Sequence, residues 1–266
     1  MHMHLIILGI LMLWSRLTEA DVCSCPLERP TKLASKRGIA YNDVNLANLL
    51  SLHCPACKWA YNWGSTREEV LNPDVEYVPM LWSNAPEHVR AWETQEKVDG
   101  IIFSFNEPDV ADQSNMTAVE AAAAHILYMN SLPDQARVGT PSITSSSKPS
   151  QGLSWLKDFL HECQNLGGCR FDFCNTHWYS EAQWIEAMFA HLDEVHKVCE
   201  GKPVWLTEFA VQGTDEEVGS FLEAAVPRLE RLPYLEAYSY FLAAQGSLVG
   251  SSGFLSYFGN IYATVS

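Results

Sequence analysis

The chain is poor in positive charge and has no apolar segment long enough to cross a membrane. Its 17 Lys and Arg residues stand against 32 Asp and Glu residues, which gives a net charge of −15. That much negative charge repels polyanions, so it argues against nucleic acids and acidic polysaccharides as partners and is compatible with a neutral substrate. The apolar run at 5–14 is shorter than the about 20 residues that a membrane-spanning helix needs. We therefore expect no nucleic acid partner and no membrane association of the mature protein.

The sequence signatures of several common enzyme classes are also missing. No Gly-rich phosphate loop of the G-x-G-x-x-G or Walker type occurs, which argues against a nucleotide-binding fold. No G-x-S-x-G elbow supports a Ser-His-Asp triad. The nine histidines show no H-E-x-x-H or other spacing typical of metal ligands. We therefore expect neither a cofactor nor a metal ion.

The first 20 residues are typical of a secretory signal peptide. A short apolar region at 5–14 is followed by Thr18-Glu19-Ala20, which puts small residues at the −3 and −1 positions of a cleavage site. We expect a secreted protein with an extracellular or cell-wall location. Residues 21–36 then form a short N-terminal segment tethered by disulfide bonds, and residues 37–266 form one catalytic domain.

Eight cysteines in a secreted chain indicate disulfide bonds. They fall into two groups, Cys23, Cys25, Cys54 and Cys57, and then Cys163, Cys169, Cys174 and Cys199. The first group has a spacing that zinc sites also use, but an oxidising compartment favours disulfides that tie the N-terminal segment to the first structural unit of the domain.

Helical spacing favours one pairing in the second group. It puts Cys199 on the same helical face as four other residues, Trp184, Met188, Leu192 and Val195. That face should pack on the sheet, where Cys174 ends a strand-like run, so we expect a Cys174–Cys199 bond. Cys163 and Cys169 would then close a small loop. Asn115 begins the only N-glycosylation sequon, and we expect it to be exposed.

Eight short apolar runs alternate with helical stretches. The predicted strands are 37–41, 58–63, 76–81, 100–105, 137–140, 171–176, 203–207 and 236–241. The predicted helices are 44–52, 86–98, 117–131, 153–163, 183–199, 216–232 and a closing segment at 256–265. This alternation predicts an α/β fold with a parallel sheet. Eight repeats and a length close to the about 250 residues typical of that fold favour a single (β/α)₈ TIM barrel.

Two of the predicted strands lead directly into a glutamate. Glu107 follows the fourth strand and Glu208 follows the seventh, and a buried carboxylate is costly unless something compensates for it. Catalytic residues of such barrels lie at these carboxyl ends of the strands. Glycoside hydrolysis requires two carboxyl groups, one to protonate the leaving oxygen and one to attack the sugar or activate water. We predict that Glu107 is the acid/base and Glu208 the nucleophile.

Polar and aromatic residues at the other strand ends are candidates for substrate binding. Asn106 could bind a sugar 2-hydroxyl or could simply form the turn before Glu107. His177 and Tyr179 could orient Glu208, or could be packing residues. Aromatic rings at the strand ends could stack on the apolar faces of sugars or could fill the core. The full set of candidates is Asn106, Tyr41, Asn62, Trp63, Trp82, His177, Trp178, Tyr179 and Tyr240.

A series of motifs follows along residues 37–209 in a characteristic order. They are RGIAYN at 37–42, WAYNWG at 59–64, YVPMLW at 77–82, FNEPD at 105–109, GTPS at 139–142, THWY at 176–179 and WLTEF at 205–209. The ordered set resembles glycoside hydrolase family 128. The resemblance implies a (β/α)₈ barrel and retaining hydrolysis of β-1,3-glucan, with Glu107 as acid/base and Glu208 as nucleophile. One departure is Tyr240, where many relatives carry Trp.

From these observations we expect a monomeric endo-β-1,3-glucanase whose partner is a β-1,3-glucan polysaccharide or oligosaccharide. Two alternatives remain open at this point. The chain could be a cell-wall protein that binds β-glucan with little hydrolysis, or a glycosidase for another neutral β-linked glycan.

Overall fold

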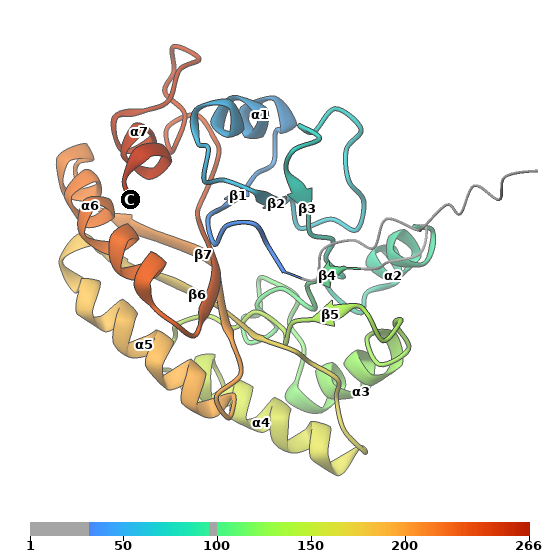
Figure 1. The fold of residues 1–266 in the computed structure, drawn as a ribbon. Helices are drawn as coiled ribbons and strands as arrows, with labels where there is room; N and C mark the ends of the chain where they lie inside the picture. The colour runs from blue at the N-terminus through green and yellow to red at the C-terminus, as the bar shows by residue number, and fades with distance from the viewer. Residues whose placement is uncertain (1–31, 96–99) are drawn as a thin grey trace, which may run out of the picture.

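Strands in the middle of the molecule are surrounded by helices (Figure 1). The structure is a computed structural model that describes residues 32–95 and 100–266. Each of the eight predicted strands is present within them, as β1 Gly38–Ala40, β2 Trp59–Tyr61, β3 Glu76–Tyr77, β4 Ile101–Ile102, β5 Arg137–Val138, β6 Cys174–Glu181, β7 Val204–Gln212 and β8 Leu235–Tyr240. Their alternation with helices confirms the α/β class.

The strands form three parallel sheets in chain order, β1-β2-β3, β4-β5 and β6-β7-β8. Single parallel bridges join them. One bridge pairs Met80 after β3 with Phe103 after β4, and another pairs Gly139 after β5 with Phe173 before β6. A third pairs Arg37 with Tyr238 of β8. Because every one of these pairings is parallel, the carboxyl ends of the strands lie on one side of the molecule.

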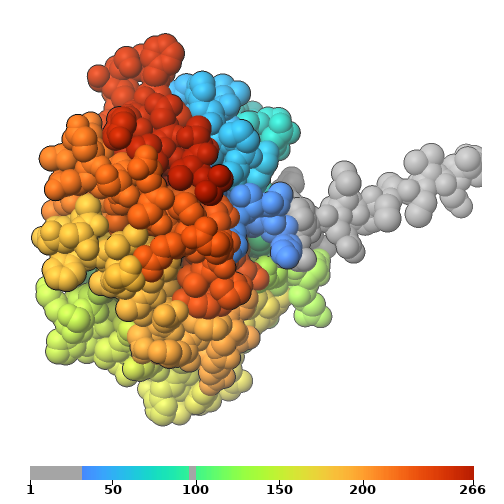
Figure 2. Space-filling view, turned by 60° about the vertical axis from the view of Figure 1, so that its left-hand side comes forward, coloured from blue at the N-terminus to red at the C-terminus, as the bar shows by residue number. Residues whose placement is uncertain are grey.

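The helices follow the strands that the sequence pattern assigns to them. Their bounds are α1 Val44–His53, α2 Pro86–Glu93, α3 Ala118–Tyr128, α4 Gly152–Asn165, α5 Ile185–Val198, α6 Asp215–Arg231 and α7 Tyr257–Thr264, with a short 3₁₀ turn at Ala182–Trp184 before α5. Capping boxes fix the starts of two of them, since Thr117 pairs with Glu120 at α3 and Thr214 pairs with Glu217 at α6. In the view of Figure 2, yellow and orange residues of the second half of the chain form the middle of the visible face, with red C-terminal residues and blue residues above them.

Two separate apolar clusters stabilise this arrangement. The smaller one includes Trp59, Phe103, Phe173 and Trp205, whose rings pack against one another with centroids 4.5–6.3 Å apart. The larger one lies between the strands and the helices. Trp59 and Trp205 are completely buried in this cluster. The prediction that Trp184 packs on the sheet is wrong, because this side chain is 51% exposed at the end of the 3₁₀ turn.

Three disulfides lie among the described residues. The bonds Cys174–Cys199 and Cys163–Cys169 are both as predicted. The third joins Cys54 to Cys57, so the prediction that these two cysteines tie down the N-terminal segment is wrong. The chain turns tightly after α1, and this turn brings the two Cα atoms to 5.3 Å, within reach of one bond.

Several predictions concern residues outside the described ranges. Cys23, Cys25 and the predicted signal peptide at 1–20 lie there. Of the segment 21–36, the structure describes only residues 32–36.

Asn115 is exposed, as expected for a glycosylation site. Within residues 32–95 and 100–266, no helix combines the length and the apolar character needed to cross a membrane.

Candidate active site

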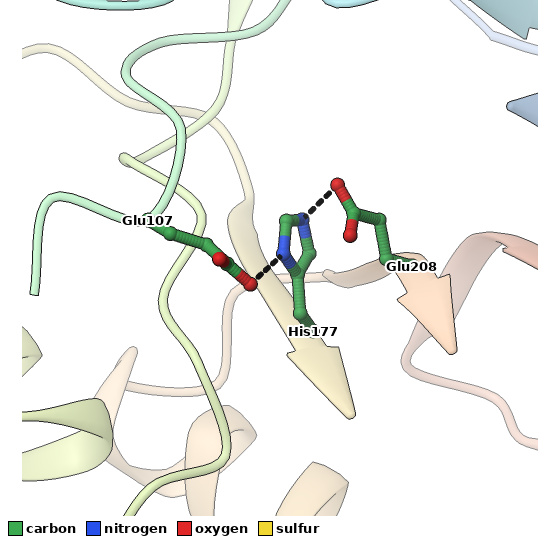
Figure 3. Close-up of side chains that lie close together, drawn as sticks. All are labelled: Glu107, His177 and Glu208. Atoms are coloured by element: carbon green, nitrogen blue, oxygen red, sulfur yellow. Dashed lines mark hydrogen bonds and ion pairs between the residues drawn. The ribbon is translucent and has the colours of Figure 1, made fainter. Parts of the chain in front are cut away.

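The two predicted catalytic carboxylates lie on opposite sides of one histidine ring (Figure 3). Nδ1 of His177 is 2.7 Å from Oε1 of Glu107, and Nε2 is 3.5 Å from Oε1 of Glu208. Glu107 follows β4, while His177 and Glu208 are register partners on the neighbouring strands β6 and β7. Strand pairing therefore brings together residues that are far apart in the sequence.

The Asn-Glu-Pro turn holds Glu107 in an unusual backbone conformation. Its φ is +41°, in the left-handed region that non-glycine residues seldom occupy. The Glu107 N–H donates to the Ser142 carbonyl at 2.8 Å. Asp109, two residues further on, accepts from the Thr144 hydroxyl at 2.5 Å and from the Gly152 N–H at 2.8 Å. Such backbone strain persists where the surroundings over-determine it, and it is common at functional sites.

Glu208 is nearly buried, and two side chains hold its carboxylate in place. The Trp63 indole N–H donates to Oε1 at 2.8 Å, and the Tyr179 hydroxyl donates to Oε2 at 2.5 Å. Burial and the neighbouring charge of Glu208 raise the pKa of Tyr179 well above its ordinary value, so the phenol stays protonated and remains a donor. The Tyr61 hydroxyl adds a longer contact to Oε1 at 3.4 Å. Because both oxygens have donors, the carboxylate is stabilised as an anion and fixed in orientation. The alternative in which Tyr179 orients Glu208 fits this geometry.

His177 is completely buried and carries a proton on Nε2. The Thr207 hydroxyl donates its only proton to Oδ1 of Asn175 at 2.6 Å, so at 3.1 Å it can only accept from Nε2 of His177. Burial alone would lower the pKa of His177, but the charges of Glu208 and Glu107 outweigh it and leave this pKa above its ordinary value. Nδ1 then either donates to the Glu107 carboxylate or accepts from its protonated form. The two groups can thus share one proton.

The three groups are close enough to be considered as metal ligands. One ligand atom from each of Glu107, His177 and Glu208 lies within 4.8 Å of the other two. Nδ1 of His177 is occupied by Glu107, and Nε2 is occupied by the Thr207 hydroxyl. Because neither nitrogen has a free lone pair to offer, the arrangement suits proton transfer between carboxyl groups better than metal binding.

A pocket of about 270 Å³ opens over the two carboxylates. It is lined by Asn42, Trp63, Trp82, Asn106, Glu107, Gln113, Glu208 and Phe241. Three of the predicted binding residues, Trp63, Trp82 and Asn106, are therefore part of it. Nδ2 of Asn106 donates to Gln113 at 3.3 Å, and its Oδ1 has no hydrogen-bond partner among the described residues. That oxygen is available to accept from a sugar hydroxyl.

Other predicted binding residues lie elsewhere. Tyr41, Trp178 and Tyr240 are 0–4% exposed and belong to the larger apolar cluster, so a sugar cannot stack on them. For example, Trp178 is stacked on Phe221 with an angle of 3° between the rings. Their prediction as sugar platforms is thus corrected to packing. Asn62 accepts from the Tyr77 hydroxyl at 2.6 Å and is not among the residues that line the pocket.

The sequence reasoning missed two residues of the pocket, Gln113 and Phe241. Phe241 follows Tyr240, and successive strand residues point to opposite sides. The buried Tyr240 faces the helices, while the partly exposed Phe241 packs edge-on against Trp63 and Tyr179. The alternation of side-chain direction along β8, counted from its buried residues, would have predicted that Phe241 faces the pocket. For Gln113, in a loop without a periodic pattern, no sequence signal was available.

Comparison with known proteins agrees with this geometry. A family model described as "Glycosyl hydrolase catalytic core" matches residues 38–262. Alkali-sensitive linkage protein 1 of Schizosaccharomyces pombe is 28% identical over 252 residues, which cover 87% of this chain. The match covers 45% of that protein, so the chain spans less than half the length of this curated relative.

Two solved structures resemble the chain over almost their full length. One is a curdlan-specific exo-β-1,3-glucanase of glycoside hydrolase family 128, subgroup III, from Blastomyces gilchristii. It is 33% identical, with 86% of this chain and 98% of that chain covered and a TM-score of 0.77. The other is an endo-β-1,3-glucanase of subgroup II from Sorangium cellulosum, which is 27% identical. Here 87% of this chain and 98% of that chain are covered, with a TM-score of 0.73.

Proposed function

Because this chain belongs to glycoside hydrolase family 128, within the broader family of glycosyl hydrolase catalytic cores, we propose that it hydrolyses β-1,3-glucan with retention of configuration. The observation that carries the proposal is the placement of Glu107 and Glu208 on either side of His177. Each of the two carboxyl groups has surroundings suited to a different task.

In the first step, Glu208 attacks the anomeric carbon as the bond from that carbon to the leaving oxygen breaks. Its two donors, Trp63 and Tyr179, fix the orientation of the attack. Glu107 gives its proton to the leaving oxygen, and the electron pair of the broken bond stays on that oxygen. In the second step Glu107 takes a proton from water, the water oxygen attacks the anomeric carbon, and the carboxylate of Glu208 leaves.

The distance between the carboxylates supports retention. An oxygen of Glu107 and an oxygen of Glu208 lie within 4.8 Å of each other. Retaining enzymes have their carboxyl groups about 5–5.5 Å apart, whereas inverting enzymes need about 6.5–9.5 Å to admit a water molecule. The separation observed here is therefore closer to the retaining value than to the inverting one.

His177 can share a proton with Glu107 in both steps. When Glu107 is a carboxylate, the imidazolium form of His177 can donate to it through Nδ1, and when Glu107 is protonated, the neutral ring can accept. The ring thus favours both protonation states that the two steps need.

We further propose that the three bridged sheets close into one (β/α)₈ barrel over residues 37–266. The bridges from Met80 to Phe103, Gly139 to Phe173 and Arg37 to Tyr238 support it, because each joins the last strand of one sheet to the first of the next. Residues 1–20 are proposed as a signal peptide and 21–36 as a short N-terminal segment. The disulfides support secretion, since such bonds persist in oxidising compartments.

The proposed substrate contacts are the aromatic side chains of the pocket and Asn106. Trp63, Trp82 and Phe241 provide apolar surfaces for the faces of glucosyl units. We propose endo action. The relative from Blastomyces gilchristii is an exo-β-1,3-glucanase, whereas the one from Sorangium cellulosum is an endo-β-1,3-glucanase. The pattern of products released from a long glucan is therefore the measurement that decides between the two.

The proposal is tested by a panel of soluble glucans with β-1,3, β-1,4 and β-1,6 linkages. We expect reducing ends to appear from the β-1,3-linked polymer, with a β-anomer as first product by NMR and a ladder of oligosaccharides. Release of glucose alone would refute endo action, and an α-anomer would refute retention. Preferential cleavage of another linkage, or binding of laminari-oligosaccharides without any product, would refute the proposed activity itself.

A further inference from the structure

Strands β6 and β7 continue past the catalytic residues as a paired ribbon. Beyond the pair formed by His177 and Glu208, the same register pairs Tyr179 with Ala210 and ends with Glu181 opposite Gln212. Glu208 therefore lies in the middle of β7, and the ribbon extends outward from the catalytic pocket. It leads toward the first turns of α5 and α6, in the helical layer seen in Figure 1.

Two hollows lie along this ribbon. The nearer one has a volume of about 300 Å³ and is lined by both strands, from Tyr179 to Glu181 and from Ala210 to Gln212. The farther one, of about 740 Å³, lies between the start of α5 and the first half of α6. We call the farther one the distal groove; its lining includes Glu181, Gln183, Ile185, Gln212, Glu216 and Ser220.

The nearer hollow lies next to the catalytic pocket at Tyr179. This residue lines the nearer hollow, and it contacts two residues that line the pocket, since it donates to Glu208 and packs its ring on Phe241. Glu181 and Gln212 line both hollows. The direction from the pocket across Tyr179 therefore leads to the nearer hollow and then to the distal groove.

The chemistry of the distal groove suits a neutral, hydroxyl-rich chain. Glu181, Gln212 and Ser220 provide carboxylate, amide and hydroxyl groups, and Ile185 and Phe221 add apolar surface. No lysine or arginine is among the described residues that line it, so an anionic ligand would meet only negative charge.

An exposed tryptophan, Trp184, contacts the groove through Glu181, one of the residues that line it. Trp184 is 51% exposed, and its indole N–H donates to Oε2 of Glu181 at 2.8 Å. This hydrogen bond holds the ring in one orientation while much of it faces solvent. A ring that is both fixed and accessible is suited to stacking on a sugar face.

We propose that the distal groove binds a second stretch of the glucan chain whose other part is in the catalytic pocket, with Trp184 as its anchor. The inference rests on the proposed function, since it takes the same β-1,3-glucan as the ligand. It predicts that long chains gain affinity that short oligosaccharides do not.

The test compares kcat/KM for long-chain laminarin with that for laminaritriose in Trp184→Ala and Ser220→Trp. The first variant removes the anchor and the second fills the groove from an exposed position on α6. Leu127→Ala, at an exposed apolar position on α3 far from these hollows in the sequence, is the control. We expect the ratio of kcat/KM for laminarin to kcat/KM for laminaritriose to fall about five- to tenfold in both groove variants and to stay unchanged in the control.

Melting temperatures close to that of wild type establish that the variants fold. A second measurement uses insoluble curdlan to remove protein from solution. It compares the fraction of Glu208→Gln that is removed with the fraction of the double variant Glu208→Gln/Trp184→Ala, and we expect less of the double variant to be removed. Equal ratios and equal depletion would overturn the distal groove and leave the proposed function intact. A wild type that neither binds nor hydrolyses either glucan would overturn both.

Discussion

Replacing Tyr179 by Phe removes one hydroxyl from the donors that hold Glu208. That hydroxyl donates to Oε2 at 2.5 Å, whereas Trp63 continues to hold Oε1 at 2.8 Å. A hydrogen bond to a charged group contributes about 1.5–3 kcal/mol. Since 1.36 kcal/mol corresponds to a factor of ten in rate, we expect kcat for laminarin to fall about 10- to 150-fold.

A matched control separates the loss of this hydrogen bond from the loss of any phenol hydroxyl. Tyr257→Phe, which removes an exposed hydroxyl on α7, is that control and should leave kcat unchanged. An unchanged kcat in Tyr179→Phe would refute the assignment of Tyr179 as the residue that orients Glu208.

Three further predictions concern the pocket and the stability of the fold. Phe241→Ala should raise KM for laminari-oligosaccharides about fivefold with a smaller change in kcat, because it removes a pocket surface; an unchanged KM would show that no sugar contacts this ring. Burial lowers the pKa of both His125 and His191 to about 4, whereas a histidine in the unfolded chain has a pKa near 6.5. These two groups therefore leave the free energy of unfolding undiminished above pH 6.5 and reduce it as the pH falls toward 4. At pH 5 the loss is about 2 kcal/mol for each histidine, and a melting temperature that stays level from pH 7 to pH 5 would contradict it. Replacing Cys174 and Cys199 together by Ala should cost about 3.5 kcal/mol in urea unfolding, since their bond closes a loop with a sequence separation of 25, and a loss below 1 kcal/mol would refute that estimate.

The sequence predicted the order of the elements and the proximity of Glu107 and Glu208 well because both depend on strong local patterns. Apolar runs that end in polar residues identify each strand, and the strand ends of a parallel sheet must lie on one side. This is enough to bring Glu107 and Glu208 together. The Cys174–Cys199 bond was predictable for a similar reason, since helical spacing gave the face of α5 that meets the sheet.

What the sequence did not reveal depends on how side chains point and where chains turn. Tyr240 and Phe241 are both aromatic and adjacent, and only the register of β8 decides which one faces the pocket. The extension of β6 to Glu181 and of β7 to Gln212 follows from mutual pairing beyond His177 and Glu208. These two polar residues directly follow the predicted runs at 171–176 and 203–207, so the sequence pattern ended both strands too early. The exposure of Trp184 likewise depends on the 3₁₀ turn that precedes α5.

The partition of roles between the two carboxylates is the central claim. It is tested most directly by measuring reducing-sugar release from laminarin by wild type, Glu107→Gln, Glu208→Gln and the exposed control Glu200→Gln, with and without azide as an external nucleophile. We predict that both Gln variants lose at least about 10³-fold in activity and that Glu200→Gln matches wild type. With an aryl β-glycoside of laminaribiose, whose leaving group departs without an acid, azide should restore turnover in smaller variants of both sites. The two sites should give opposite anomers: Glu208→Gly an α-glycosyl azide and Glu107→Gly a β-glycosyl azide. Wild-type activity in Glu107→Gln or Glu208→Gln, or the opposite pair of azide anomers, would contradict it.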